Sequence, residues 1–126
     1  MKFMIMVKGS EQAGPPPKAL MDGIAQLGIE ASKAGVLVQV GGLAPTATGA
    51  KMRLSNGKLT TIDGPFTEAK EVIGGYAVYD LKSKTEAIEW TRKFMELHAT
   101  HWKGWEGEAE IRQIMDTGSF DAPRPS

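Results

Sequence analysis

One acidic side chain at a predicted turn is the first candidate for chemistry in this 126-residue sequence. Asp63 is followed by Gly64, Pro65 and Phe66, and because a proline has a fixed φ angle, the nearby carboxylate should be held in one direction. Such a carboxylate can act as a general base or as an orienting acid. The alternative is structural, since an aspartate in a turn commonly accepts hydrogen bonds from backbone amides two residues further on.

A dense charged group follows this turn. Glu68, Lys70 and Glu71 alternate in sign, and in a dry cleft such a set can shift the pKa of a carboxylate or an amine. It can equally be a solvated surface turn, which is the interpretation favoured for Glu68. Asp63, Lys70 and Glu71 are therefore the predicted catalytic residues.

Three further side chains are predicted to bind a substrate. Arg53 lies on a predicted hairpin and Arg112 on the last predicted strand, and either guanidinium can form a forked pair with a carboxylate. An ion pair with an acid such as Glu110 is the more ordinary role. Tyr76 follows two glycines that allow close backbone approach, so its hydroxyl can reach a ligand. Otherwise it is a core aromatic whose hydroxyl finds one partner.

The two histidines of the chain do not predict a metal site, and no cofactor is expected. His98 and His101 have the i, i+3 spacing that places two ligands on one helix face, but no clear third ligand is nearby. Trp102 and Trp105 favour an aromatic packing patch instead. The sequence contains no cysteine, which excludes disulfides, thiolate metal sites and cysteine nucleophiles.

The charge balance excludes two classes of partner. Lys plus Arg and Asp plus Glu each number 15, so the net charge is zero, whereas nucleic-acid binders need a basic excess to neutralise phosphates. Neutrality also argues against attachment to acidic membranes. The apolar run over residues 3–7 is shorter than the core of a signal peptide or a membrane span, so a cytoplasmic protein is expected.

The first half of the chain predicts a strand, a helix and a second strand. Residues 2–8 form a continuous apolar run between lysines, which is typical of a strand buried on both faces. After a loop over 9–17, apolar residues at steps of 3 and 4 predict an amphipathic helix over 20–34, with Gly35 as a left-handed C-cap. Residues 36–43 are β-branched and apolar, which indicates a strand.

The second half of the chain predicts a hairpin, a strand, a helix and a last strand. Asn56 and Gly57 between two short strands are the strongest local hairpin signal, since both residues tolerate positive φ. The predicted ranges are strands over 51–54 and 58–62, a strand over 72–81, a helix opened by the capping box of residues 83–86, an irregular aromatic segment over 98–107 and a strand over 108–115.

The order of these elements predicts an α+β fold. Without the hairpin the order is βαββαβ, the ferredoxin-like arrangement, in which both helices cover one face of the sheet. Residues 3–7 are all apolar and residues 36–40 nearly so, whereas a solvated second face would require alternation. A second copy over the open face removes this problem, so a homodimer is expected. We expect one domain over residues 1–120 and a flexible tail over 121–126.

Several stretches together carry a family resemblance. They are Gly41-Gly42-Leu43-Ala44-Pro45, the run from Asp63 to Glu71, Gly74-Gly75-Tyr76, Glu89-Trp90 and the run from Glu108 to Gln113. With these stretches the chain resembles the YCII-related family in its DGPF-motif branch, from about residue 1 to residue 120. The resemblance implies a dimeric α+β barrel, with two ferredoxin-like sheets facing each other and a cleft beside them.

The resemblance implies a function only broadly. Relatives are linked to dehalogenation or lyase-type steps, so a cofactor-independent lyase, isomerase or dehalogenase-like activity on a small organic acid or aromatic ligand is one hypothesis. A ligand-binding or regulatory module, linked to extracytoplasmic-function sigma-factor signalling, is the second, and a structural or interaction protein is the third. The family is proposed to use a histidine–aspartate pair, but here both histidines lie far along the chain from Asp63, so no histidine role is transferred.

Overall fold

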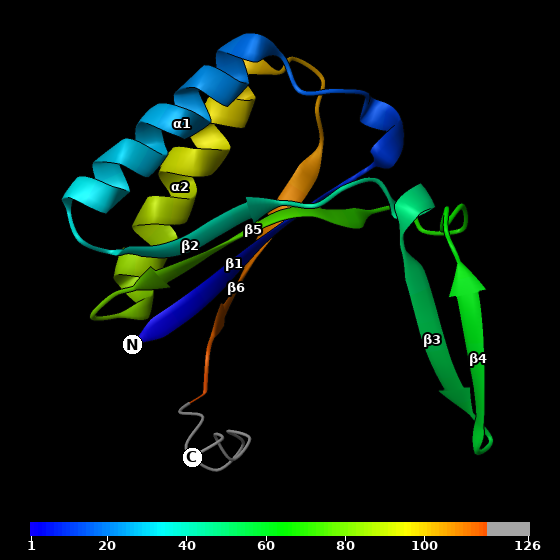
Figure 1. Cartoon of the computed structure of the whole chain (residues 1–126). Helices are drawn as coiled ribbons and strands as arrows, with labels where there is room; N and C mark the ends of the chain where they lie inside the picture. Colours follow the sequence, from blue (N-terminus) through cyan, green and yellow to red (C-terminus); the bar gives the residue numbers. More distant parts are fainter. Residues whose placement is uncertain (116–126) are drawn as a thin grey trace.

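Six strands, two α-helices and two short 3-10 helices make up the computed structural model, which describes residues 1–115; the predicted tail over 121–126 lies outside the described residues (Figure 1). The elements are β1 (Lys2–Gly9), η1 (Glu11–Ala13), α1 (Lys18–Lys33), β2 (Leu37–Gly42), η2 (Thr46–Thr48), β3 (Ala50–Ser55), β4 (Lys58–Asp63), β5 (Val72–Asp80), α2 (Lys84–His101) and β6 (Gly107–Gln113).

The main sheet has the predicted ferredoxin-like topology. Its strand order is β2-β5-β1-β6, and all three neighbouring pairs are antiparallel. β3 and β4 form a separate two-stranded sheet inserted between β2 and β5. Figure 1 shows α1 and α2 on one face of the main sheet, while the β3–β4 hairpin leaves one end of that sheet and extends away from the helices. The predicted α+β fold with an inserted hairpin is confirmed for the single chain.

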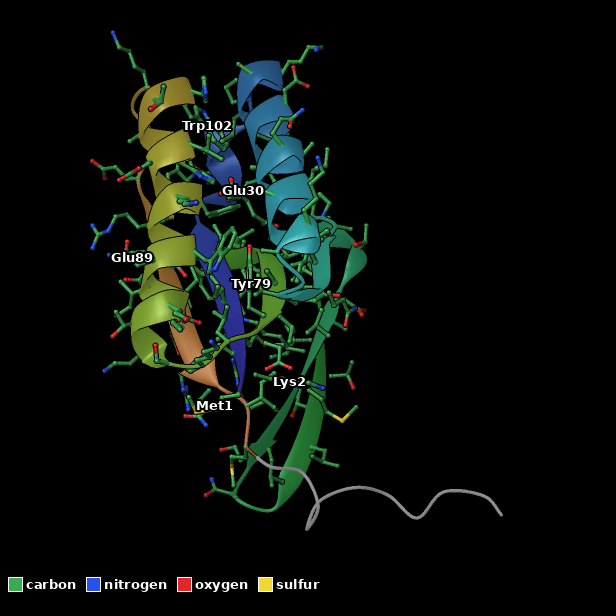
Figure 2. All side chains as sticks on the ribbon, turned by 90° about the vertical axis from the view of Figure 1, so that its left-hand side faces the viewer. Met1, Lys2, Glu30, Tyr79, Glu89 and Trp102 are labelled. Atoms are coloured by element: carbon green, nitrogen blue, oxygen red, sulfur yellow. The ribbon has the colours of Figure 1, made fainter. Side chains whose placement is uncertain are left out.

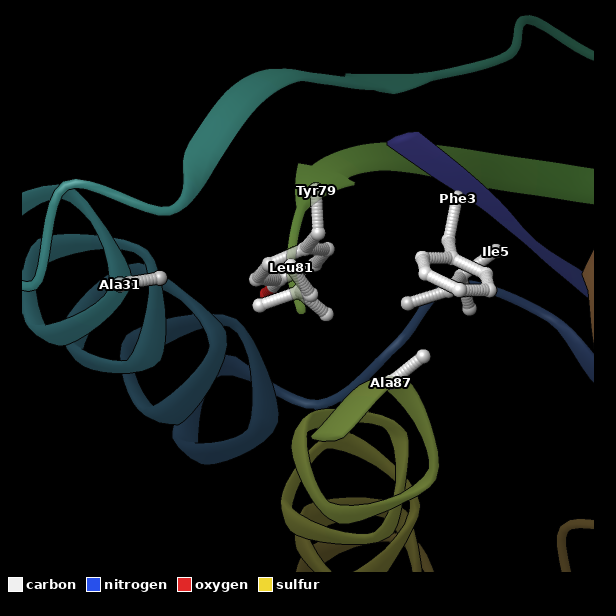
Figure 3. Close-up of a cluster of buried hydrophobic side chains, with 6 residues drawn as sticks. All are labelled: Phe3, Ile5, Ala31, Tyr79, Leu81 and Ala87. Atoms are coloured by element: carbon white, nitrogen blue, oxygen red, sulfur yellow. The ribbon is translucent and has the colours of Figure 1, made fainter. Parts of the chain in front are cut away.

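The core lies between the sheet and the two helices. Phe3 and Ile5 of β1 are 3% and 4% exposed, and with Tyr79 they point from the sheet toward Ala31 of α1 and Ala87 of α2 (Figure 3). Because side chains alternate along a strand, the even-numbered residues of β1 point to the opposite face. In the single chain, therefore, the apolar run of β1 is fully buried on the helix side only.

The opposite face of the sheet, which we call the open face, is defined by the strand register. Met4 lies opposite Val78 of β5 and Arg112 of β6, and Met6 lies opposite Tyr76 and Glu110. Residues paired in this way share a face. The methionines are only partly buried, so an apolar strip crosses the middle of the open face.

The first helix follows the prediction closely at its C-terminus. α1 ends at Lys33, and Gly35 has a φ of 74°, the left-handed conformation expected after a helix. The two helices pack side by side (Figure 2). Lys93 of α2 donates a hydrogen bond of 2.6 Å to Glu30 of α1. Gly23 permits this packing, since a Cβ atom there would lie 2.9 Å from a methyl carbon of Leu97.

The second helix is longer than predicted. Its start is confirmed, because the Ser83 hydroxyl accepts a hydrogen bond of 3.2 Å from the Glu86 amide. The segment predicted as irregular from residue 98 is wrong at its start, since α2 continues to His101. The physical reason lies beyond the helix: His98 is 6% exposed and packs against Trp105, with ring centroids 4.6 Å apart, in addition to Phe94 one turn earlier in α2 at 4.7 Å. This packing stabilises the last turn.

The stability of the fold should depend on pH through His98. Burial lowers the pKa of this histidine from 6.5, so the folded chain binds its proton less readily than the unfolded chain does. Its contribution to stability should be complete above pH 6.5 and should decrease as the pH falls from 6.5 to the lower pKa of the folded state. Urea unfolding followed by tryptophan fluorescence at several pH values would measure this.

A matched pair of variants separates His98 from the other titrating groups. His98→Gln should flatten the dependence of unfolding free energy on pH just below 6.5. His101→Gln, the same substitution at the exposed end of α2, is the matched control. An unchanged slope in His98→Gln would show that another group is responsible.

Candidate functional site

The Asp63 side chain stands free at the base of the hairpin. Asp63 is the last residue of β4, where its backbone pairs with Ala50, and it is exposed. Within residues 1–115 its carboxylate makes no ion pair and accepts no hydrogen bond, either from a side chain or from a backbone amide. It therefore does not cap the backbone amides of its own turn, and it remains available to a ligand.

Gly64, the next residue, is held against the loop that contains η2. Its amide donates a hydrogen bond of 2.9 Å to the Gly49 carbonyl. A Cβ atom on Gly64 would lie 1.6 Å from the Thr46 carbonyl oxygen, far inside van der Waals contact. The motif therefore needs a glycine here for steric reasons, and this residue has a structural role.

Two residues that the sequence analysis did not select complete this contact. The Glu11 carboxylate accepts a hydrogen bond of 2.6 Å from the Thr46 amide and another of 2.7 Å from the Thr46 hydroxyl. The same hydroxyl accepts a hydrogen bond of 3.1 Å from the Phe66 amide. The bonds from Thr46 lower the pKa of Glu11. We call Glu11, Thr46 and Phe66 the loop clamp, since it ties three loops together.

A second charged group lies on the open face of the sheet. The Lys8 ammonium donates a hydrogen bond of 2.5 Å to Glu110 and lies 4.0 Å from Glu108. The Arg112 guanidinium donates a hydrogen bond of 3.2 Å to the other oxygen of Glu110. We call Lys8, Glu108, Glu110 and Arg112 the open-face cluster. It confirms the pairing of Arg112 with Glu110 that the sequence suggested as the ordinary role.

Lys8 and Glu110 shift each other's pKa within the open-face cluster. The hydrogen bond to Glu110 raises the pKa of Lys8, and the nearby charges of Glu110, Glu108 and Glu71 raise it further. The bonds from Lys8 and Arg112 lower the pKa of Glu110. Because both pKa values move away from neutrality, this pair stays charged near neutral pH and is not suited to exchange protons there.

Tyr76 presents its hydroxyl on the same face. The hydroxyl accepts a hydrogen bond of 2.9 Å from the side-chain amide of Gln39 on β2. A Cβ atom on Gly41 would lie 2.9 Å from the Tyr76 ring, so this glycine leaves the space that the ring occupies. The prediction of a close backbone approach beside Tyr76 is consistent with this packing, although the glycine that provides it is on β2.

The predicted residues do not form one site in the single chain. Tyr76 and Arg112 share the open face, and the charge of Glu71 acts on Lys8 there, whereas Asp63 and Arg53 lie on the hairpin. The register places Asp63 and Arg53 on opposite faces of that hairpin. Lys70 is exposed in the turn before β5.

Two grooves lie elsewhere on the described part of the molecule. One, of about 570 Å³, is an apolar channel between α1 and β2, lined by residues that include Ile24, Ile29 and Val40. The other, of about 710 Å³, runs between the two helices. Neither is lined by any residue of the predicted site, so neither supports the predicted chemistry.

The described residues contain neither a cluster of metal ligands nor a helix that could span a membrane. Among residues 1–115, no three His, Asp or Glu side chains come together as metal ligands would. His98 lies with its ring against Trp105, while His101 is exposed. In the same part of the chain, neither helix combines the length and apolar character needed to cross a bilayer.

Comparison with known proteins places the chain in a family. The pattern of the YCII-related domain matches residues 1–116. An uncharacterized protein, R00369 of Rhizobium meliloti (strain 1021), is 40% identical over 60 residues, and this stretch covers 48% of each of the two chains. The match to that relative thus spans about half its length, whereas the domain match extends from β1 beyond β6. The chain belongs to the YCII-related family.

Proposed function

We propose that this protein is a homodimer that binds a small aromatic acid on the open face of its sheet. The observation that carries the proposal is the position of an apolar strip, formed by Met4, Met6 and Val78, directly beside the hydrogen-bonding groups of Arg112 and Tyr76. Ligand sites in proteins typically combine such an apolar floor with a few polar groups that fix orientation.

The homodimer is supported by the exposure of this face. Both helices cover the other side of the sheet (Figure 1). On the open side Val78 is 8% exposed, whereas Met4 and Met6 are only partly buried, so these two methionines leave part of the strip exposed. Two open faces brought together would shield it, and the space left between them would exclude water from a ligand. Hydrogen bonds and ion pairs to that ligand would then be stronger than on an exposed surface.

The ligand class follows from the neighbours of Met4. Arg112 lies opposite Met4 in the β1–β6 ladder, and its side chain is 72% exposed, with one of its donor groups used by Glu110. A guanidinium carries five N–H groups, so others remain for a carboxylate. Methionine sulfur makes favourable contacts with aromatic rings, and Tyr76 offers a further ring on the same face.

Calorimetric titration with a panel of aromatic and aliphatic carboxylic acids would test the proposal. We expect aromatic acids to bind more tightly than aliphatic acids of equal charge. Arg112→Gln should weaken that binding at least about tenfold, since it removes a charge-assisted hydrogen bond. Arg92→Gln, at an exposed arginine of α2, is the matched control and should bind as the wild type does. Equal affinities of Arg112→Gln and Arg92→Gln would refute the assigned site.

A second candidate function rests on Asp63. Its carboxylate has no side-chain partner within the described residues, which leaves it able to accept a proton or orient a substrate. A cofactor-independent lyase, isomerase or dehalogenase-like step is the activity to test with each acid that binds. If Asp63→Asn binds the acid but no longer converts it, the result supports an enzyme. If the wild type binds the acid without converting it, the result supports a binding protein.

A further inference from the structure

The β3–β4 hairpin has two chemically different faces. The register places Met52, Leu54 and Leu59 on one face, and Lys51, Arg53, Lys58 and Thr60 on the other. The apolar side chains are 69%, 69% and 68% exposed, among the highest values for large hydrophobic residues in the described chain. We call Met52, Leu54 and Leu59 the arm face.

Within residues 1–115, the strands of this hairpin pair only with each other. The rest of the described chain holds it at its base, through the Gly64 hydrogen bond, the loop clamp and the Lys51 ammonium, which lies 4.3 Å from the centre of the Phe66 ring. A two-stranded hairpin alone in water is marginally stable at best, and three or more strands or a packing partner are usually needed. The arm face therefore requires a surface to pack against.

The surface area of the chain indicates how large that partner surface is. The chain exposes 9196 Å², whereas a folded monomer of 13.6 kDa exposes about 6,600 Å². Residues 116–126 account for no more of this difference in area than the full surface of an extended segment of that length. The remaining difference still exceeds the roughly 800 Å² that each subunit buries in a standard interface. The missing contact is thus as large as a subunit interface.

The direction of the hairpin points to a second copy of this chain as the occupant. The hairpin extends on the open-face side of the main sheet (Figure 1), where the proposed dimer places its partner. Its strands have six residues each, about 20 Å in length, and facing sheets pack about 10 Å apart. A hairpin of that length reaches past the partner's sheet.

We propose that the β3–β4 hairpin is an intersubunit arm whose arm face packs against the second copy in the homodimer. This inference rests on the proposed dimer and adds a contact outside the two open faces. In the two-fold dimer each subunit contributes one arm, so any substitution in the arm face acts twice.

Two double variants on the same hairpin test the arm. Leu54→Ser with Leu59→Ser alters one cross-strand pair of the arm face, and Arg53→Ser with Thr60→Ser alters the neighbouring pair on the opposite face. Sedimentation velocity over a dilution series would give the dimer dissociation constant of each. The leucine variant should raise that constant at least about 100-fold, since four leucines per dimer lose their burial, while the control should change it less than about threefold.

The outcomes distinguish the arm from the dimer. If the wild type is a dimer and both double variants have the same dissociation constant as the wild type, the proposal of the arm is overturned and the proposal of the dimer stands. A wild type that stays monomeric at high concentration would overturn both. Hydrogen exchange adds a second measurement: the amides over 50–63 should be protected in the dimer and exposed on dilution. Protection that persists in the monomer would show that the hairpin packs on its own chain, against the proposal.

Discussion

Gly64→Ala should lower the free energy of unfolding by about 3 kcal/mol, since inserting a methyl group where no space exists costs about 1–3 kcal/mol and sometimes more. The new Cβ atom would meet the Thr46 carbonyl oxygen at 1.6 Å, and that oxygen belongs to the backbone and cannot rotate away. The turn would have to move, which would also break the hydrogen bond from Gly64 to Gly49 and that from Phe66 to Thr46. Urea denaturation followed by circular dichroism would measure the loss.

Gly42→Ala is the matched control for this experiment. The substitution is the same, Gly42 is exposed, and no atom lies within 4 Å of the position its Cβ would take. Neither glycine has the positive φ that disfavours alanine, so left-handed backbone strain does not distinguish the two variants, whereas the space for the new methyl group does. Gly42→Ala should change stability by less than about 0.5 kcal/mol. Comparable unfolding curves for the two variants would mean that the turn does not pack on η2 as described.

Met6→Glu should convert the proposed homodimer into a folded monomer. Met6 lies in the middle of the open face, opposite Tyr76 and Glu110, so a glutamate there would bring one unpaired carboxylate per subunit into the interface. An unpaired buried charge costs several kcal/mol, which corresponds to at least about a 100-fold rise in the dimer dissociation constant. Light scattering coupled to size-exclusion chromatography would report the mass, and circular dichroism would verify the fold.

The control for this variant introduces the same charge elsewhere. Met21 on α1 is 48% exposed, so Met21→Glu adds an equal charge to the chain without touching the open face. It should remain a dimer at concentrations where Met6→Glu is monomeric. A wild type of monomer mass at micromolar concentration would contradict the homodimer directly. A Met6→Glu dimer of wild-type strength would place the interface on another surface.

Neighbouring residues of the motif Asp63-Gly64-Pro65-Phe66 make different contacts. Gly64 and Phe66 fasten the hairpin base to the loops around η2 through the loop clamp. Asp63 takes no side-chain part in this contact within the described residues. The structure therefore supports a structural role for Gly64 and Phe66, whereas the catalytic role of Asp63 is a proposal. The Gly64 and Asp63 variants above probe these two roles separately.

Local signals predicted the elements well because they act within a few residues. Asn56 and Gly57 have φ angles of 51° and 77°, as the predicted hairpin turn requires. They form the two-residue turn that connects β3 to β4. The Ser83 cap marks the start of α2 for the same reason. The end of α2 was predicted less well, because His98 is held in the helix by rings from beyond the helix and not by a local signal.

Closeness in the sequence did not predict which of the site residues lie close together in space. Asp63 and Arg53 belong to one short hairpin, yet strand alternation places them on opposite faces. Lys8 and Glu110 are 102 positions apart in the chain, yet they form the shortest ion pair of the open-face cluster. Glu11 and Thr46, 35 positions apart, likewise had no sequence signal beyond their polarity.

The sequence by itself determined the periodicity, caps and turns, hence the order of elements and, through the apolar run of β1, the existence of an open sheet face. It could do so because helix and strand patterns repeat every few residues and record which side of an element is apolar. Only the tertiary structure decided which charges meet, that the Gly64 turn packs on η2, and that the apolar face of the hairpin is exposed. Those outcomes depend on strand register and loop packing, which bring together residues that no local pattern relates.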